Sequence, residues 1–273
     1  MWALYEPIHT VTYFSAQGRD ALTAAGLRGF WRGYFAGRAA PLGAVPAAPV
    51  LASFFSFAPS MVTRALPDVW TMATPEVTLR ARADGAVAAL EVLLTGVPEA
   101  SVTEAVTLLE QATGALEPAG RVLGAANLAL PRNEHPYARL WQAATTLREH
   151  RGDGHNAALV ASAIGPLDIL ALRCGLDLIR ATVQPARGWT DQEWAAAEVR
   201  LLERGWLDGG GSITADGRDL VESLEDATDV AAASPWDALG PVASQRLTEL
   251  LRPMARACAA VLPASNPIGL TPR

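Results

Sequence analysis

The sequence predicts a mainly α-helical protein with a winged helix in its C-terminal half. Three consecutive features favour this fold: a helix start at Thr190, a glycine-rich turn, and a second helix start at Thr214. Thr190 and Glu193 have the spacing of a capping box, in which a hydroxyl and a carboxylate satisfy the first free N–H groups of a helix. Arg204-Gly205 is typical of a helix end, because a cation suits the last turn and glycine suits the residue after it.

Between these signals the pattern changes from helical to extended. The apolar residues of the first helix fall at helical spacing and are Trp194, Ala197, Leu201 and Leu202. Segments 206–208 and 212–214 then flank the three glycines 209–211, which is the pattern of a short β-hairpin. A helix followed by a hairpin predicts a winged helix.

Helical patterns punctuated by proline and glycine fill most of the remaining chain. We predict helices over residues 8–17, 21–36 (one helix, or a pair broken near Gly26), 48–57, 60–66, 75–94, 101–113, 121–130, 137–150, 153–164, 167–178 and 241–262. Ser101 and Glu104 form a second capping-box pattern. The polar stretch 131–136 suggests a division into an N-terminal half (1–130), a C-terminal winged-helix half (131–232), and a C-terminal helix and tail (233–273).

Several short segments resemble those of known regulators. The run Thr214-Ala215-Asp216-Gly217-Arg218 resembles the helix start that follows the wing in MarR-like proteins. Segments 12–14, 29–38 and 147–155 resemble an actinobacterial family of MarR-like helix-turn-helix proteins without a settled activity. Similar Arg-Gly-aromatic entries at 28–31 and 187–189 suggest that the N-terminal half is a degenerate copy of the C-terminal one. We therefore expect a tandem winged-helix protein, a MarR-like pseudodimer whose halves enclose one asymmetric ligand cavity, as the resemblance implies.

The charge of the sequence argues against DNA binding. The 273 residues carry a net charge of −6, with 22 arginines and no lysine. The outward face of the helix after Thr190 is not basic and consists of Gln192, Glu193, Ala196, Val199, Arg200 and Glu203. Asp208 and Asp216 stand beside the glycine turn. Because duplex binding depends on cations that neutralise phosphates, nucleic acid is not expected as a partner.

A glycine run marks the first candidate ligand site. Gly29, Gly33 and Gly37 recur every fourth residue, which indicates either tight helix packing or the wall of a pocket. For the pocket, aromatic surface comes from Trp31, Tyr34 and Phe35, and an anionic group could be held by Arg28, Arg32 or Arg38. The candidate ligand-binding residues are His9, Tyr13, Arg32, Tyr34 and Arg38.

The polar run 148–155 is the second candidate. His150, Asp153 and His155 are placed at a predicted junction between two helices, where the carboxylate could orient an imidazole for acid-base catalysis. The alternative is structural: Asp153 caps the following helix, His150 and Arg151 complement the end of the preceding one, and Arg148 and Glu149 form a salt bridge. The histidine spacing matches no zinc pattern, so no metal is expected.

These patterns lead to a functional expectation. The chain contains no nucleotide-binding, hydrolase or Cys-x-x-Cys motif, no apolar run of membrane length and no signal sequence, so we expect a cytoplasmic protein and can name no cofactor. The two isolated cysteines, Cys174 and Cys258, fit buried thiols. We expect a winged-helix scaffold that has lost DNA binding and binds a small organic molecule, anionic or neutral, between its halves, with cofactor-independent acid-base catalysis as an open extension. The alternative is a ligand-responsive, MarR-like DNA-binding regulator. Pairing into a homodimer is left open.

Overall fold

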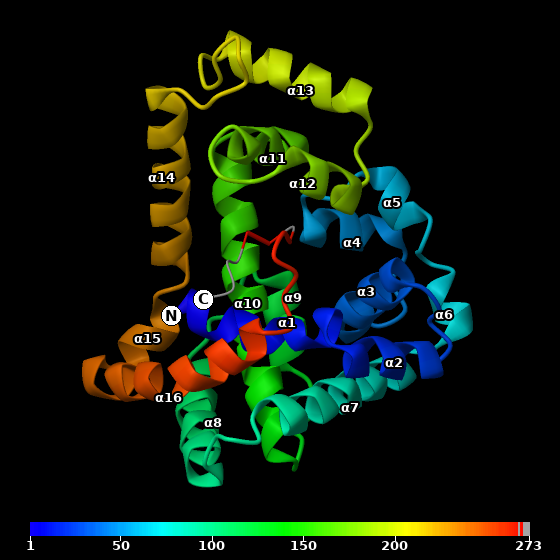
Figure 1. The fold of residues 1–273 in the computed structure, drawn as a ribbon, viewed down its shortest axis with the longest axis vertical. Coiled ribbons are helices and arrows are strands. Elements are labelled where there is room, and N and C mark those ends of the chain that lie inside the picture. Colours follow the sequence, from blue (N-terminus) through cyan, green and yellow to red (C-terminus); the bar gives the residue numbers. More distant parts are fainter. Residues whose placement is uncertain (267, 270–273) are drawn as a thin grey trace.

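One long helix organises the molecule. The computed structural model describes residues 1–266 and 268–269. Helix α10 (Pro136–Ala161) runs through the centre, and α1, α7, α8, α9 and α14 pack against it (Figure 1). The described residues are mainly helical, which confirms the predicted class at that level. No single described helix is long and apolar enough to span a membrane. Helices α10 and α11 meet the length and composition criteria only when taken together, and the pair is bent by 97°.

The N-terminal part forms two packed groups of helices. Its elements are α1 (Trp2–Phe14), α2 (Ala16–Ala24), α3 (Phe30–Ala39), the 3-10 turn η1 (Ala40–Leu42), α4 (Ala47–Phe54), α5 (Pro59–Thr63), α6 (Val69–Met72), α7 (Pro75–Leu93), α8 (Glu99–Gly114) and α9 (Val122–Leu128). An aromatic core around Phe35, Phe54 and Phe57 joins α3 to α6. The break predicted near Gly26 separates α2 from α3.

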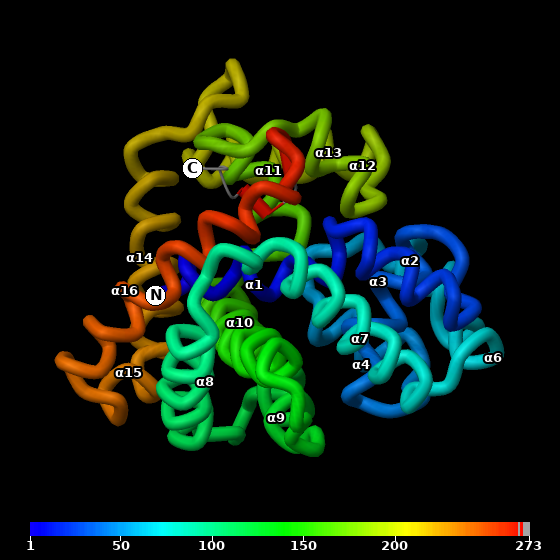
Figure 2. The backbone as a smooth tube through the Cα atoms, turned by 60° about the horizontal axis from the view of Figure 1, so that its bottom comes forward, coloured from blue at the N-terminus to red at the C-terminus, as the bar shows by residue number. Residues whose placement is uncertain are grey.

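The C-terminal part builds the opposite end and then returns. Its elements are α11 (Pro166–Cys174), α12 (Arg180–Arg187), α13 (Asp191–Glu203), α14 (Ala215–Ala231), α15 (Ser234–Leu239) and α16 (Pro241–Ala259). Helices α11 to α13 cap one end of α10, and α16 crosses back to lie against α1 (Figure 2). The main core joins Leu90, Leu140 and Leu250, so all three predicted parts contribute to it. Residues 267 and 270–273 of the predicted tail lie outside the described residues.

The predicted helix junction at residues 150–153 is wrong, because α10 is continuous from Pro136 to Ala161. The glycines there serve packing instead of a turn. A Cβ at Gly154 would collide with the Arg121 guanidinium and would lie 3.2 Å from the Ala231 Cβ atom. Contacts distant in sequence therefore require glycine inside this helix, and a local pattern cannot reveal them.

The predicted β-hairpin is not confirmed as a pair of strands. Within the described ranges no strand forms, and one antiparallel bridge joins Leu207 to Ile213. The Asp208 carboxylate accepts hydrogen bonds from the backbone N–H groups of Gly210 (2.8 Å) and Ser212 (3.0 Å), which tightens the turn. Since Thr214 already caps α14, few residues remain for a ladder. We call residues 206–214 the turn segment. The pseudodimer and a wing in the N-terminal half stay predictions.

The two capping boxes have opposite outcomes. At α13 both hydrogen bonds of the box are present: the Thr190 N–H donates to Glu193 (2.9 Å), and the Glu193 N–H donates to Thr190 Oγ1 (3.2 Å). At α8 the prediction is wrong. That helix begins at Glu99 after Pro98, which places Ser101 inside the first turn.

Candidate ligand cavity and nucleic-acid interface

Helices α11, α12 and α13 form a compact three-helix unit with its own core. Trp194, Ala197 and Leu201 are fully buried in this core, as their spacing predicts. They pack with Leu172 of α11 and Val183 of α12. Leu202 is 49 % exposed and does not belong to the core. The unit has the order of a helix-turn-helix domain, with α13 as its third and most exposed helix.

The outward face of α13 is the predicted one. All six residues predicted to face outward are exposed. Many of its acidic groups, however, are engaged within the protein. Glu193 belongs to the capping box, and Asp191 accepts hydrogen bonds from Arg180 (3.1 Å) and Gln184 (2.9 Å). Glu198 accepts a hydrogen bond from the indole N–H of Trp194 (2.9 Å). Arg180 lies 3.1 Å from Asp191 and 3.4 Å from Glu198, so its positive charge offsets part of the acidic charge of this helix.

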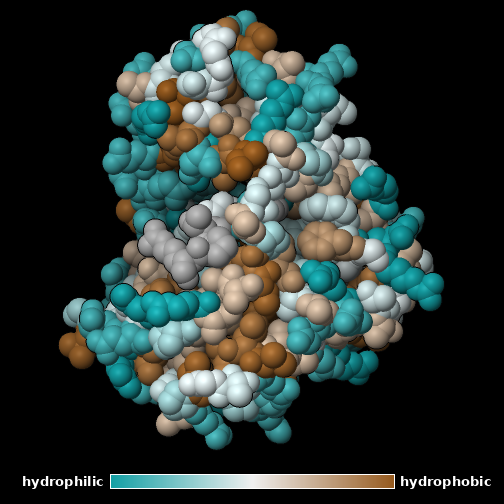
Figure 3. Space-filling view, in the orientation of Figure 1, coloured by the Kyte–Doolittle hydropathy of each residue, from teal (hydrophilic) through white to brown (hydrophobic). Residues whose placement is uncertain are grey.

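Three arginines surround the corner where α13 meets the turn segment and α14. The side chain of Arg200 is 50 % exposed and contacts Asp168. The Arg204 guanidinium lies 3.7 Å from the centroid of the Trp206 ring, and Arg218 is exposed in the first turn of α14. Hydrophilic side chains cover much of this end of the molecule (Figure 3). Exposed arginines are therefore available beside α13.

A cavity of about 200 Å³ lies between α10, the helix-turn-helix unit and the N-terminal helices. We call it the interdomain cavity. Four arginines contribute to its lining: Arg38, Arg148, Arg173 and Arg187. The described lining residues include no carboxylate, and apolar surface comes from Phe54, Phe55, Phe57, Leu159, Ile169, Leu170 and Leu178. Guanidinium groups beside aromatic rings suit an organic anion.

Glu149 lies behind the cavity and fixes two of its arginines. Its side chain is only 1 % exposed and accepts two hydrogen bonds from Arg38, at 2.8 and 2.9 Å. Arg148 donates to the same carboxylate at 2.8 Å and lies 3.5 Å from Glu6. Burial alone would raise the pKa of Glu149, but Arg148 and Arg38 hold it below its usual range. The predicted salt bridge between Arg148 and Glu149 is confirmed and extends to Arg38.

Residues 53–58, which we call the phenylalanine segment, connect the cavity to the helix-turn-helix unit. The Ala58 N–H donates to the Arg187 carbonyl (2.9 Å), and the Trp189 indole donates to the Ser56 carbonyl (3.1 Å). The Arg187 guanidinium lies 4.6 Å from the Phe57 ring centroid. On the α10 side, Asn156 donates to the Ser53 carbonyl (2.8 Å). The segment thus contacts the cavity and the end of α12 together.

The three predicted catalytic residues do not share one centre. Asp153 accepts a hydrogen bond from the Gly124 N–H (2.8 Å) and caps α9, and the backbone of His150 packs against Gly124. His155 instead contacts Thr228 Oγ1 of α14 (2.9 Å) and lines the interdomain cavity. Burial lowers the pKa of both histidines and raises that of Asp153 to about 6. The geometry does not support one acid-base site built from all three.

Four of the five predicted ligand-binding residues meet in a chain of contacts. The ring centroids of His9 and Tyr13 are 5.2 Å apart, and those of Tyr13 and Tyr34 are 4.9 Å apart. Arg38 donates to the Tyr34 hydroxyl at 3.3 Å. Arg32 lies apart from them, in a hollow that Trp31, Met61 and Arg64 also line.

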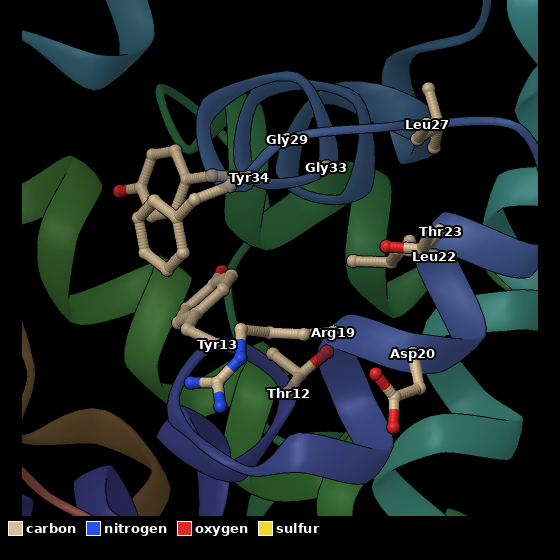
Figure 4. A pocket seen from close by; sticks show the side chains of 11 residues that line it. Thr12, Tyr13, Arg19, Asp20, Leu22, Thr23, Leu27, Gly29, Gly33 and Tyr34 are labelled. Carbon is tan, nitrogen blue, oxygen red and sulfur yellow. The ribbon is translucent and has the colours of Figure 1, made fainter.

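Tyr13 and Tyr34 also line a second hollow, of about 250 Å³, between α1, α2 and α3. Figure 4 shows the two rings side by side at one end of it. The glycine run has a packing role here, since a Cβ at Gly33 would lie 3.3 Å from Leu22 Cδ1. Gly29 precedes α3 as its N-terminal cap and has a φ of 93°. Because Tyr34 lines the interdomain cavity as well, its ring stands between the two spaces.

Some cavity residues were not singled out from the sequence. Arg173, Arg187 and the phenylalanine segment were absent from the candidates, and Arg148 was considered only as part of a salt bridge. One signal was present: Phe54-Phe55-Ser56-Phe57 places three aromatic residues within four positions at a helix end. Within the described residues, no three His, Cys, Asp or Glu side chains come together as metal ligands would.

Comparison with known proteins places this architecture in a family. A family profile described as "Helix-turn-helix family" matches residues 1–263, and the chain therefore belongs to that family. No curated protein matches. No solved structure matches either. The predicted helix-turn-helix character is thus confirmed at the level of the family.

The family overturns the expectation that nucleic acid is not a partner. A helix-turn-helix family that spans nearly the whole chain points to nucleic-acid binding, so that expectation is wrong. The expectation relied on the outward face of residues 192–203 and on Asp208 and Asp216, and it did not weigh Arg204 and Arg218, which are exposed at the same end of the molecule.

Proposed function

We propose that the protein is a ligand-responsive DNA-binding regulator. In this proposal the helix-turn-helix unit docks on a DNA duplex, and the interdomain cavity receives a small organic anion that alters the docking. The observation that carries the proposal is the position of the phenylalanine segment, which lines the cavity and bonds to Arg187 and Trp189 at the entry to α13. A ligand and the DNA-facing helix would therefore act on one shared element.

The cavity supports an anionic ligand of modest size. Small-molecule sites commonly have volumes of about 300–1,000 Å³. At about 200 Å³ this cavity suits a compact molecule. Arg38 and Arg148 are already held by Glu149, which keeps their guanidinium groups in place without ligand. An incoming anion would gain hydrogen bonds from groups that need little reordering.

Backbone strain at Phe55 supports a two-state coupling. This residue ends α4 with a φ of 50°, which is uncommon for a residue with a side chain. Such conformations cost of order 1–3 kcal/mol and occur at functional sites where the surrounding structure imposes them. A ligand that contacts Phe55 could favour a relaxed arrangement of the segment. The bonds to Arg187 and Trp189 would then carry that change to α13.

On the DNA side, the corner arginines Arg200, Arg204 and Arg218 would contact phosphates. Base edges would be met by the exposed side chains of α13, among them Gln192 and Val199. Each phosphate contact makes the logarithm of the binding constant fall with the logarithm of salt concentration, by a slope of about 0.9. The three proposed phosphate contacts can therefore be detected from the dependence of DNA affinity on salt concentration.

Selection from a random duplex pool tests DNA binding without a known operator. We expect the wild-type protein to enrich a defined sequence, and an Arg200→Ala, Arg204→Ala, Arg218→Ala triple variant to lose it while keeping its melting temperature. Arg252→Ala, which changes an exposed arginine on α16, is the matched control. Failure of the wild-type protein to enrich any sequence would refute the proposal.

The ligand response is tested on the selected duplex by fluorescence anisotropy. Small aromatic and aliphatic carboxylates are added at constant ionic strength, each beside its neutral amide. We expect at least one carboxylate to change DNA affinity, and Arg173→Ala to reduce this response. If DNA binding is sequence-specific but no carboxylate alters it, the DNA-binding part of the proposal would hold and the anionic-ligand part would be refuted.

A further inference from the structure

A second cavity, remote from the helix-turn-helix unit, is lined by a buried arginine whose hydrogen-bond partners are all neutral. This cavity, of about 200 Å³, lies between α7, the loop before α10, and the start of α10. We call it the α7 cavity. Arg82 forms part of its lining and is only 4 % exposed. The function proposed above does not use this cavity.

The protein gives Arg82 neutral partners only. Its Nη1 donates to the Gly37 carbonyl (2.9 Å), and its Nη2 donates to Asn127 Oδ1 (3.1 Å) and Gln142 Oε1 (3.4 Å). Among the described residues no carboxylate lies within ion-pair distance of it. Arg38 of α3 and Arg148 of α10, by contrast, both contact Glu149. A buried charge without a counter-charge is costly, and burial lowers the pKa of Arg82 to about 10.

The arginine is nevertheless held rigidly. Its guanidinium lies 5.2 Å from the centroid of the Trp141 ring, within the range of a cation–π contact. Gln142 is fixed in turn by Thr146 (3.2 Å), and Asn127 by the Leu123 carbonyl (2.9 Å). A charge held in place by neutral acceptors beside a cavity is arranged to receive an anion. Among the described residues, no acceptor forms a hydrogen bond with its Nε.

The rest of the lining limits what the anion can be. Arg80 adds a second, exposed guanidinium, and Leu130, Pro131 and Ala138 offer apolar surface for a short carbon chain. Asp84 also lines the cavity, and its charge repels a dianion more strongly than a monoanion. These features together favour a single negative charge on a small apolar body.

We propose that the α7 cavity is a binding site for a small organic monocarboxylate, whose carboxylate supplies the counter-charge that Arg82 lacks. The carboxylate would contact Arg82 and Arg80, and the carbon chain would lie against Leu130 and Pro131. This site is separate from the interdomain cavity and does not depend on DNA binding.

Calorimetric titration of the full chain tests the proposal with butyrate as the probe. Butyramide is the neutral isostere, succinate is the dianion, and ionic strength is held constant. We expect saturable binding of butyrate, at least tenfold weaker binding of succinate, and none of butyramide. Arg82→Gln should abolish binding of butyrate, and Arg80→Ala should weaken it at least threefold.

The variants distinguish this site from the others. Arg80 is exposed, so Arg80→Ala keeps the test decisive even if Arg82→Gln does not fold. Arg252→Ala, which changes an exposed arginine outside both cavities, should leave butyrate binding unchanged, and Arg173→Ala reports any butyrate that binds in the interdomain cavity. Equal binding of butyrate and butyramide, no binding of butyrate, or loss of binding only in Arg173→Ala would overturn the proposal.

Discussion

The charges along α10 and the charges around α13 belong to the same residue types but contribute differently. Glu149 is enclosed between Arg38 and Arg148, where each group depends on the others for its counter-charge. Arg200 and Asp168 also form a pair, but the arginine is half exposed and water can replace the contact. The comparison teaches that burial, more than the number of ion pairs, decides which charges maintain the fold and which remain available to a partner.

The first prediction removes the central buried carboxylate. Glu149→Gln should lower the free energy of unfolding by about 3–5 kcal/mol, because Arg38 would lose its counter-ion and Arg148 would keep only Glu6, at 3.5 Å. Urea unfolding followed by circular dichroism measures the change. The matched control is Glu104→Gln, which breaks an exposed pair with Arg246 and should leave the unfolding midpoint nearly unchanged. Equal effects of the two substitutions would contradict the comparison.

The second prediction uses pH. Burial raises the folded-state pKa of Asp153 to about 6, above its ordinary value of 3.8, although the bond from the Gly124 N–H opposes the rise. The folded state therefore binds this proton more tightly than the unfolded chain. The resulting stabilisation is fully present below pH 3.8 and is lost as the pH rises through about 6.

Asp153→Asn removes this titration and keeps an oxygen acceptor for Gly124. Relative to the wild type, we expect the variant to gain about 1–3 kcal/mol in free energy of unfolding between pH 4 and pH 7. Urea unfolding of both proteins at four pH values measures this difference. A pH-independent difference would show that Asp153 does not titrate in this range.

The third prediction concerns the contact that joins the two regions. Trp189→Phe removes the indole donor to the Ser56 carbonyl and should cost about 0.5–1.5 kcal/mol of stability. DNA affinity without ligand should change little, whereas the response to carboxylate should fall. Anisotropy titrations with and without ligand separate these effects. An unchanged ligand response would show that the coupling does not pass through the phenylalanine segment.

The sequence predicts most reliably those features whose causes lie within a few residues. Thr190 and Glu193 define the start of α13, and the helix predicted over 75–94 matches α7 (Pro75–Leu93) closely, because caps and apolar periodicity act locally. The continuity of α10 was missed. Gly154 is required there by Arg121 and Ala231, which are distant in the sequence.

The candidate site divides in the same way. Tyr34 and Arg38 were predicted because they accompany the glycine run 29–37 and carry aromatic and anion-binding chemistry. Arg173 and Arg187 reach the same cavity only through the packing of α11 and α12 against α10 and α4, which no local pattern expresses. The unbalanced charge of Arg82 was missed for a related reason: its importance comes from the absence of a nearby carboxylate in the folded, described part of the chain.

The smallest expected effect on stability is that of Arg200→Ala. Ion pairs at the surface contribute about 0–1 kcal/mol, and Arg200 is 50 % exposed although its partner Asp168 is only 12 % exposed, so breaking the contact should shift the melting temperature by no more than about 4 °C. The same substitution should reduce the salt slope of DNA binding by about one, since it removes one phosphate contact. Thermal unfolding and anisotropy at several salt concentrations provide the two measurements, with Arg252→Ala as the control. A large loss of stability with an unchanged salt slope would assign Arg200 to the fold. The opposite result would place it at the DNA interface.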